Sequence, residues 1–157
     1  MTNKPKIVLG IDPGYAIIGW SVIDKTKKEI KVLDYGVIKT SKKLEFPDRL
    51  EKIFEELNKI IKKHKPTIAG IEQLYFAKNT TTAIHVGHAR GVIILALQKN
   101  NIKIQEFTPL QIKQATASYG RAEKKQIQKM MQLILKLPEL PEPDDAADAL
   151  AVAWMVK

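Results

Sequence analysis

The sequence contains no cysteine, which excludes disulfide bonds, thiolate metal sites and cysteine nucleophiles and suits a reducing compartment. It also has no long hydrophobic run near its start. The first apolar run, IVLGI at 7–11, is too short for a signal-peptide core or a membrane span. Low-complexity tracts and linkers are absent as well. We therefore expect a soluble, cytoplasmic protein in which residues 1–157 form one domain with a full hydrophobic core.

Positive charge is what the sequence has in excess. Its 26 Lys and Arg residues outnumber 17 Asp and Glu residues, which gives a formal charge of +9. An excess of this size on a small chain favours a polyanionic partner, and nucleic acid is the first candidate. Lysine-rich surfaces also keep heat-adapted proteins soluble and form ion-pair networks. The charge alone leaves both explanations open.

The first half of the chain predicts three strands and a helix. Strands rich in β-branched residues are expected at 6–12, 15–24 and 30–40, and their short connections make them an antiparallel meander. The next segment repeats apolar residues at helical spacing, begins at Pro47 and Asp48, and stops at Pro66. These apolar residues are Leu50, Ile53, Phe54, Leu57, Ile60 and Ile61.

The second half alternates strands and helices. The nearly continuous apolar run at 67–72 is typical of a strand buried on both faces. Another strand is expected at 102–107, and helices are expected at about 82–98, 109–116, 123–136 and 145–156. The order is therefore βββαβαβ followed by helices. It predicts an α/β fold, a mixed five-stranded sheet with helices on both faces.

Acidic residues stand at the ends of several predicted elements. Asp12 ends the first strand in GIDPG, and Glu72 ends the fourth in GIEQ. Asp145 and Asp148 are three residues apart in the first turn of the last helix, so they share one face. Helix capping explains Asp144 or Asp145 but explains Asp148 poorly. If the first and fourth strands are neighbours, Asp12 and Glu72 emerge side by side, where α/β sheets build sites.

The combination of these acids indicates metal-assisted chemistry. Each one alone has an ordinary explanation, since a strand-end aspartate before Pro-Gly is usually a turn residue. Together, carboxylates without His or Cys select hard cations such as Mg²⁺ or Mn²⁺. Two such ions about 4 Å apart support in-line attack on a phosphodiester, one activating water and the other stabilising the leaving oxygen. The sequence thus predicts a nuclease-type site.

The chain resembles the RuvC-type Holliday-junction resolvases. The resemblance rests on GIDPG, IEQLYFAKN, HARGVI, QIKQATASYGRAEKKQI and the closing DDAADALAVA, which follow the family's order and spacing over nearly the whole chain. GIDPG alone is unspecific, because other nuclease and phosphotransferase folds use a similar strand end. AKN, GRAEK and DAADAL in register are specific to the family.

This resemblance implies an RNase H-like fold acting as a homodimer, in which each subunit cuts one of two like-polarity strands of a four-way DNA junction. The implied cofactor is Mg²⁺, two ions per active site, with Mn²⁺ as a substitute. The implied partner, besides junction DNA, is a RuvA/RuvB-type branch-migration complex. By motif, the catalytic and metal-binding carboxylates are Asp12, Glu72, Asp145 and Asp148, and Asp144 is left as a helix N-cap.

The resemblance also assigns four residues to DNA binding. Tyr75 stands where the family places an aromatic residue, often phenylalanine, near the junction crossover, where a ring can stack on an unpaired base. Lys78 lies in AKN, and Lys113 and Lys124 match functional lysines suited to holding phosphate oxygens. Ordinary loop packing and solvated lysines are the alternatives.

Two histidines and two glycines in the 82–98 helix invite other interpretations. His85 and His88 share one face, but no third soft ligand is near, so surface or interface histidines are favoured over a zinc site. Gly87 and Gly91 indicate close helix packing, at a dimer contact or in the core.

Three other functions compete with an active junction endonuclease. A junction-binding module with a degenerate site is disfavoured because every family carboxylate is present. An actin-like phosphotransferase would need a second glycine-rich phosphate loop, and the sequence has none. A nuclease for RNA–DNA hybrids fits the fold, but the AKN and GRAEK matches favour junction DNA.

Overall fold

The computed structural model of the protein describes residues 6–74, 80–117 and 124–157. Its strands are Ile7–Asp12 (β1), Ile17–Asp24 (β2), Lys31–Lys39 (β3), Ile68–Glu72 (β4) and Lys103–Phe107 (β5). Its helices are Phe46–His64 (α1), Thr80–Lys99 (α2), Pro109–Ala117 (α3), Lys124–Ile134 (α4) and Asp144–Met155 (α5). Every element expected from the sequence is present, in the predicted order.

The strands form one mixed sheet in the order β3-β2-β1-β4-β5. Strands β1, β2 and β3 pair antiparallel because short turns connect them, whereas β4 runs parallel to β1 and β5 runs parallel to β4. Helices α1 and α2 supply the long crossover connections that parallel pairing requires. The predicted five-stranded mixed sheet is confirmed.

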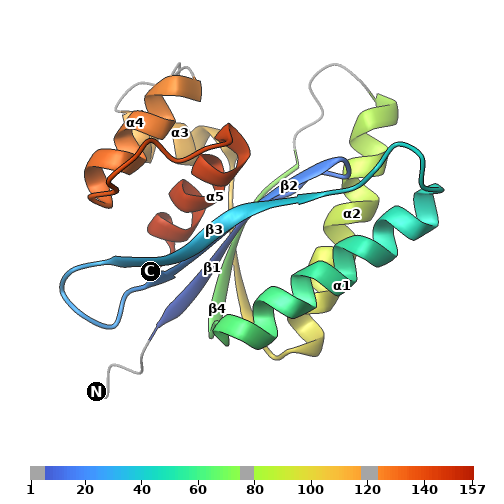
Figure 1. Ribbon diagram of the computed structural model, residues 1–157, viewed down its shortest axis with the longest axis horizontal. Coiled ribbons are helices and arrows are strands. Elements are labelled where there is room, and N and C mark those ends of the chain that lie inside the picture. Colours follow the sequence, from blue (N-terminus) through green and yellow to red (C-terminus); the bar gives the residue numbers. More distant parts are fainter. Residues whose placement is uncertain (1–5, 75–79, 118–123) are drawn as a thin grey trace.

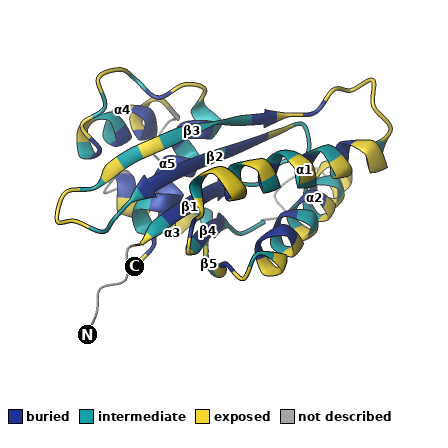
Figure 2. Cartoon of the chain, turned by 60° about the horizontal axis from the view of Figure 1, so that its bottom comes forward, coloured by how far each residue is buried: buried dark blue, intermediate teal, exposed yellow. Residues whose placement is uncertain are grey.

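Helices cover both faces of the sheet, as Figure 1 shows: α1 and α2 lie on one side, and α3, α4 and α5 lie on the other. Alternating side chains of β1 supply both layers, since Leu9 and Ile11 pack with α1 and α2, while Val8 packs with α4 and α5. In Figure 2 the strands β1 and β2 are mostly buried, whereas the edge strand β3 is largely intermediate or exposed. Within the described ranges, no helix is long and apolar enough to cross a membrane.

Helix α5 begins differently from the prediction. Its N-cap is Pro143, with extended backbone and no side-chain capping bond, so the expected N-cap role of Asp144 is wrong. The Pro143 carbonyl accepts the N–H groups of Ala146 and Ala147 at 3.0 and 3.3 Å, which starts the helix one residue early. Asp144 is therefore the first helical residue, where its charge still suits the helix dipole.

The far end of α5 is fixed by a lysine from the β2–β3 turn. The Lys25 ammonium donates to the carbonyls of Trp154 and Val156, each at 2.6 Å. The last carbonyls of a helix lack partners within the helix and attract cations. This contact ties the C-terminal end of α5 to the β2–β3 turn.

Candidate active site

Asp12 and Glu72 end two neighbouring parallel strands. The pairing of β1 with β4 aligns Ile11 with Ile71, so the next residue of each strand is the acidic one. The two acidic side chains are hydrogen-bonded to each other. The structure thus brings them together at the carboxyl edge of the sheet, as the sequence predicted.

Helix α5 lies unusually close to the same sheet. Glycine allows this approach, because a Cβ on Gly19 of β2 would stand 1.9 Å from the Asp145 carbonyl oxygen, and one on Gly10 of β1 would stand 2.1 Å from that of Ala149. The buried Ser21 hydroxyl also donates to the Ala149 carbonyl, at 2.8 Å. Gly19 pairs with Asp12 across the sheet, so the first turn of α5 reaches Asp12.

The four carboxylates are close enough to act on one another electrostatically. Burial, followed by repulsion from Glu72, Asp148 and Asp145, raises the pKa of Asp12 to about 9. Burial also raises the pKa of Glu72, although its hydrogen bond with Asp12 and the charge of Lys113 act in the opposite direction. Negative charge is therefore in excess at this edge of the sheet, and it requires a proton or a cation.

The chemistry of these donors fits a hard divalent cation, since all are carboxylate oxygens. Among the residues that the structure describes, no three acidic or histidine side chains already have the arrangement of a metal-binding group. Asp12 and Glu72 instead share a hydrogen bond. The raised pKa of Asp12, with repulsion from Glu72, Asp148 and Asp145 among its causes, indicates that these carboxylates together favour a cation.

A hollow of about 230 Å³ opens beside Asp12 and Glu72. Its other lining residues are Pro13, Gln73, Leu74, Val86, Arg90 and Pro109. The acidic pair thus lies beside an opening bounded by β1, β4 and α2, and one cationic side chain, Arg90, contributes to its wall. An opening that has carboxylates suited to a hard cation and an arginine in its wall suits a phosphate-bearing substrate.

Arg90 belongs to a contact network that the sequence analysis missed. Its guanidinium lies 2.9 Å from the Glu106 carboxylate of β5, and the Gln73 amide donates to the same carboxylate at 3.2 Å. A signal was present, because Arg90 is a charged residue in the middle of a helix whose following turns are largely apolar. Nothing in the sequence pointed to Glu106 as its partner.

The four predicted DNA-binding residues lie in different parts of the chain, and the structure describes two of them. Lys113 lies on α3, and its charge acts on Glu72, which brings it to the acidic edge. Lys124 is the first residue of α4. Tyr75 and Lys78 lie outside the described residues.

The two histidines of α2 have different surroundings. His85 is half-buried, stacked on Phe46 at 4.5 Å and edge-on to Tyr15 at 5.1 Å between ring centroids. This ring packing accounts for the presence of His85 in α2 better than the expected surface or interface position does. His88 is exposed, as expected, with its ring 5.7 Å from Phe46.

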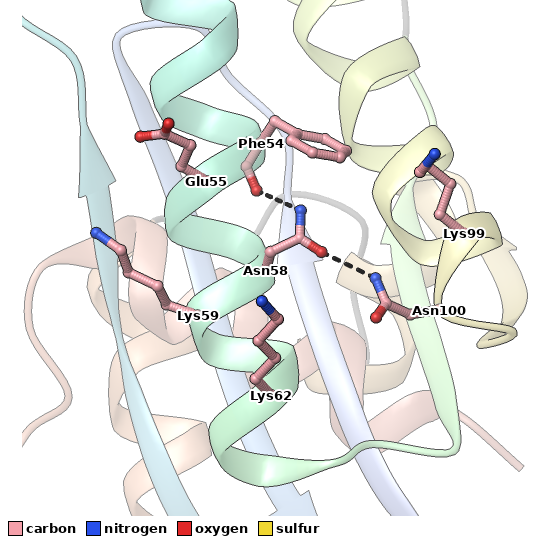
Figure 3. A pocket seen from close by; sticks show the side chains of 7 residues that line it. All are labelled: Phe54, Glu55, Asn58, Lys59, Lys62, Lys99 and Asn100. Atoms are coloured by element: carbon pink, nitrogen blue, oxygen red, sulfur yellow. Dashed lines mark hydrogen bonds between the residues drawn. The ribbon is translucent and has the colours of Figure 1, made fainter.

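A second hollow, of about 590 Å³, lies between α1 and α2. Figure 3 shows Asn58 between Phe54 and Asn100, hydrogen-bonded to both, with Lys59, Lys62 and Lys99 around them. The C-terminal end of α1 leads directly into β4, so this hollow lies toward the edge of the sheet opposite Glu72. Its one carboxylate, Glu55, cannot form an acidic cluster, and the hollow is separate from the candidate active site.

Comparison with known proteins gives a consistent result. Residues 8–155 match the family model described as crossover junction endodeoxyribonuclease RuvC. A protein of that description from Petrotoga mobilis is 56% identical over 94% of this chain and 91% of its own length. Another, from Alkaliphilus metalliredigens, is 52% identical over 94% of this chain and 90% of its own length.

Solved structures agree in fold. RuvC of T. thermophilus in complex with a Holliday junction substrate superposes with a TM-score of 0.87 at 31% identity, over 94% of this chain and 90% of that one. The yeast mitochondrial Holliday junction resolvase Ydc2 superposes with a TM-score of 0.69 at 17% identity, over 94% of this chain and 76% of that one, and supports the RNase H-like fold alone. This chain belongs to the family of crossover junction endodeoxyribonucleases RuvC.

Proposed function

We propose that this chain cuts four-way (Holliday) DNA junctions by paired, symmetric nicks in two strands of like polarity, in recombination and DNA repair. The observation that carries the proposal is the convergence of Asp12 and Glu72 with the first turn of α5, in a chain of formal charge +9. An acidic pocket on a basic protein suits phosphodiester cleavage, since the basic surface holds the backbone and metal ions neutralise the pocket.

The metal-binding residues in this proposal are Asp12, Glu72, Asp145 and Asp148, with Mg²⁺ as the cofactor and Mn²⁺ as a substitute. When bound, such ions supply water activation and charge stabilisation at the leaving oxygen. The carboxylates hold the metal ions, and Lys113 contributes positive charge beside Glu72. The products carry 5′-phosphate and 3′-hydroxyl ends.

Binding of junction DNA is assigned to Lys113, Lys124, Tyr75 and Lys78. The position of Lys113 near Glu72 supports a contact with the phosphate next to the cleaved bond. Lys124 opens α4, on the same face of the sheet as α5. For Tyr75 and Lys78 the support is the family motif alone.

A homodimer is proposed because α2 carries an apolar stripe that is exposed among the residues the structure describes. Ile84 is 56% exposed and Leu95 is 54% exposed, and a Cβ on Gly91 would meet nothing within 4 Å. These residues share one face of α2 at spacings of seven and four, the pattern of a helix–helix contact. A two-fold dimer presents two identical sites to a near two-fold junction. We further propose one nuclease domain, a cytoplasmic location and a RuvA/RuvB-type branch-migration complex as partner.

Cleavage of a synthetic four-way junction tests this function directly. Linear duplex and an RNA–DNA hybrid are incubated beside it, each with and without Mg²⁺, and the nick positions are mapped. Symmetric paired nicks in the junction alone, dependent on metal, are expected. Tight junction binding without cuts in Mg²⁺ or Mn²⁺ would instead identify a binding module.

A further inference from the structure

A closed ring of contacts surrounds the peptide bond that follows Glu72. The Arg90 Nε of α2 donates to the Glu72 carbonyl at 3.5 Å, and the Gln73 main-chain N–H donates to the Phe107 carbonyl at 2.8 Å. The ring closes through Glu106, which contacts Arg90 with one carboxylate oxygen and accepts from the Gln73 amide with the other. The chain beyond Glu72 is thereby fixed on both sides.

The Arg90 guanidinium is held inside the protein and close to the acidic pair. Its side chain is only 18% exposed, and it lines the same hollow as Asp12 and Glu72. The terminal nitrogen Nη2 is shielded from solvent and lies 2.9 Å from the Glu106 carboxylate. Arg90 lowers the pKa of Glu106, first through hydrogen bonding and then through its charge.

Glu106 is the carboxylate that balances this charge. Guanidinium groups pair strongly with carboxylates in sheltered sites, and an uncompensated one seeks another partner. The carboxylates that line the same hollow as Arg90 are Asp12 and Glu72, so they are the partners open to Arg90 when Glu106 is removed. An arginine paired with them would occupy oxygens that a metal ion needs.

We propose that Arg90 positions Glu72 through its main chain, and that Glu106 keeps the Arg90 guanidinium away from the Asp12–Glu72 pair so that metal ions can bind there. Arg90 is thus a positioning residue, and Glu106 shields the metal site. This inference rests on the proposed function, because it assumes that Asp12 and Glu72 hold metal.

The proposal predicts an effect that an ordinary structural ion pair does not. Glu106→Gln frees the guanidinium to compete with the metal for the carboxylates. Mn²⁺ affinity should therefore fall about tenfold, which is the lower end of the loss in affinity seen when a metal ligand loses a supporting contact. The double variant R90Q/E106Q removes the competitor as well, so its Mn²⁺ affinity should return to within about threefold of the natural value. Arg90→Gln alone should also leave the Mn²⁺ affinity within about threefold of the natural value. It should lower kcat, because Glu72 is less well placed.

Calorimetric Mn²⁺ binding provides a measurement independent of cleavage, and junction cleavage across Mg²⁺ concentrations provides the second. Lys63→Gln is the matched control, since Lys63 pairs with Asp34 at 2.8 Å at the other end of the sheet. Melting temperatures establish that each variant is folded. R90K is expected to behave like R90Q, because a lysine ammonium cannot make both of the Arg90 contacts in the same geometry.

Two results would overturn the inference while leaving the proposed function intact. One is natural Mn²⁺ affinity in E106Q, and the other is equal weakening in E106Q and R90Q/E106Q, which would make Glu106 purely structural. Failure of the proposed function is distinguishable, because Mn²⁺ binding would then be absent in the natural protein or unaffected by Asp12→Asn. Either of those results also removes the basis of this inference.

Discussion

Asp12 illustrates how a single residue that the proposed function requires can lower the stability of the fold. The pKa of its carboxyl is raised from 3.8 to about 9, so the folded state binds this proton more tightly than the unfolded chain does. The resulting stabilisation is complete below the unfolded pKa and is lost as the pH rises through the folded value. Without metal, the fold therefore loses stability progressively as the pH rises from about 4 to about 9, because it must hold a proton on Asp12 that the unfolded chain releases.

Asp12→Asn should make the metal-free protein more stable at pH 8. In EDTA, the melting temperature of the natural protein is expected to fall between pH 5 and pH 9 more steeply than that of the variant. A difference of about 4 °C or more at pH 8 is expected, because 1 kcal/mol shifts the midpoint by about 2–4 °C in a chain of this size. Scanning calorimetry measures both profiles.

Added Mg²⁺ is the control for that experiment. It should raise the melting temperature of the natural protein, because a ligand that binds only the folded state stabilises it, and it should raise that of Asp12→Asn much less. Parallel pH profiles for the two proteins would contradict the assigned electrostatics.

At the scale of elements, the site depends on how closely α5 approaches the sheet. Gly19→Ala should destabilise the protein by about 2 kcal/mol and lower cleavage, because the new Cβ would meet the main-chain oxygen of Asp145, which cannot move without displacing the helix. Gly36→Ala on β3 is the matched control, since its Cβ would lie 3.2 Å from the Trp20 ring, a side chain that can shift. Urea unfolding and junction cleavage are measured for both, and equal losses would refute the special role of Gly19.

The elements themselves were predictable from the sequence, because apolar periodicity and proline positions are local signals. The meeting of Asp12 and Glu72 was expected only if the first and fourth strands were neighbours, because local signals do not give the strand order. The close packing of Gly19 on Asp145 could not be predicted from the sequence, because it depends on which strand lies under the first turn of α5. The Asp144 N-cap was wrong for a different reason: capping is decided by local backbone geometry, and Pro143 takes that position.

The Arg90–Glu106 contact illustrates a different limit. The two residues are sixteen positions apart on a helix and a strand, and a single sequence carries no record of such pairs. The ring packing of His85 with Phe46 and Tyr15 joins three separate segments in the same way. These contacts arise only from the tertiary arrangement.

At the scale of the whole molecule, the proposed paired nicks require two active sites, which the proposed dimer through the α2 stripe would supply. Leu95→Glu should produce a monomer in sedimentation velocity at micromolar concentration, because a charge would be buried in an apolar contact. Paired cutting should then give way to slow, unpaired nicks. Leu133→Glu is the control, since Leu133 is 72% exposed on α4, on the opposite face of the sheet. A dimeric Leu95→Glu variant would place the contact elsewhere.

The central claim is that carboxylates from β1, β4 and α5 form one catalytic site, and the most direct test is Asp148→Asn beside Asp144→Asn. Both variants are assayed for binding and cleavage of one four-way junction in Mg²⁺. Asp148→Asn should bind the junction within about threefold of the natural protein and cut it at least about a thousandfold more slowly, whereas Asp144→Asn should cut normally. Normal cleavage by Asp148→Asn, or equal loss in both variants, would contradict the account.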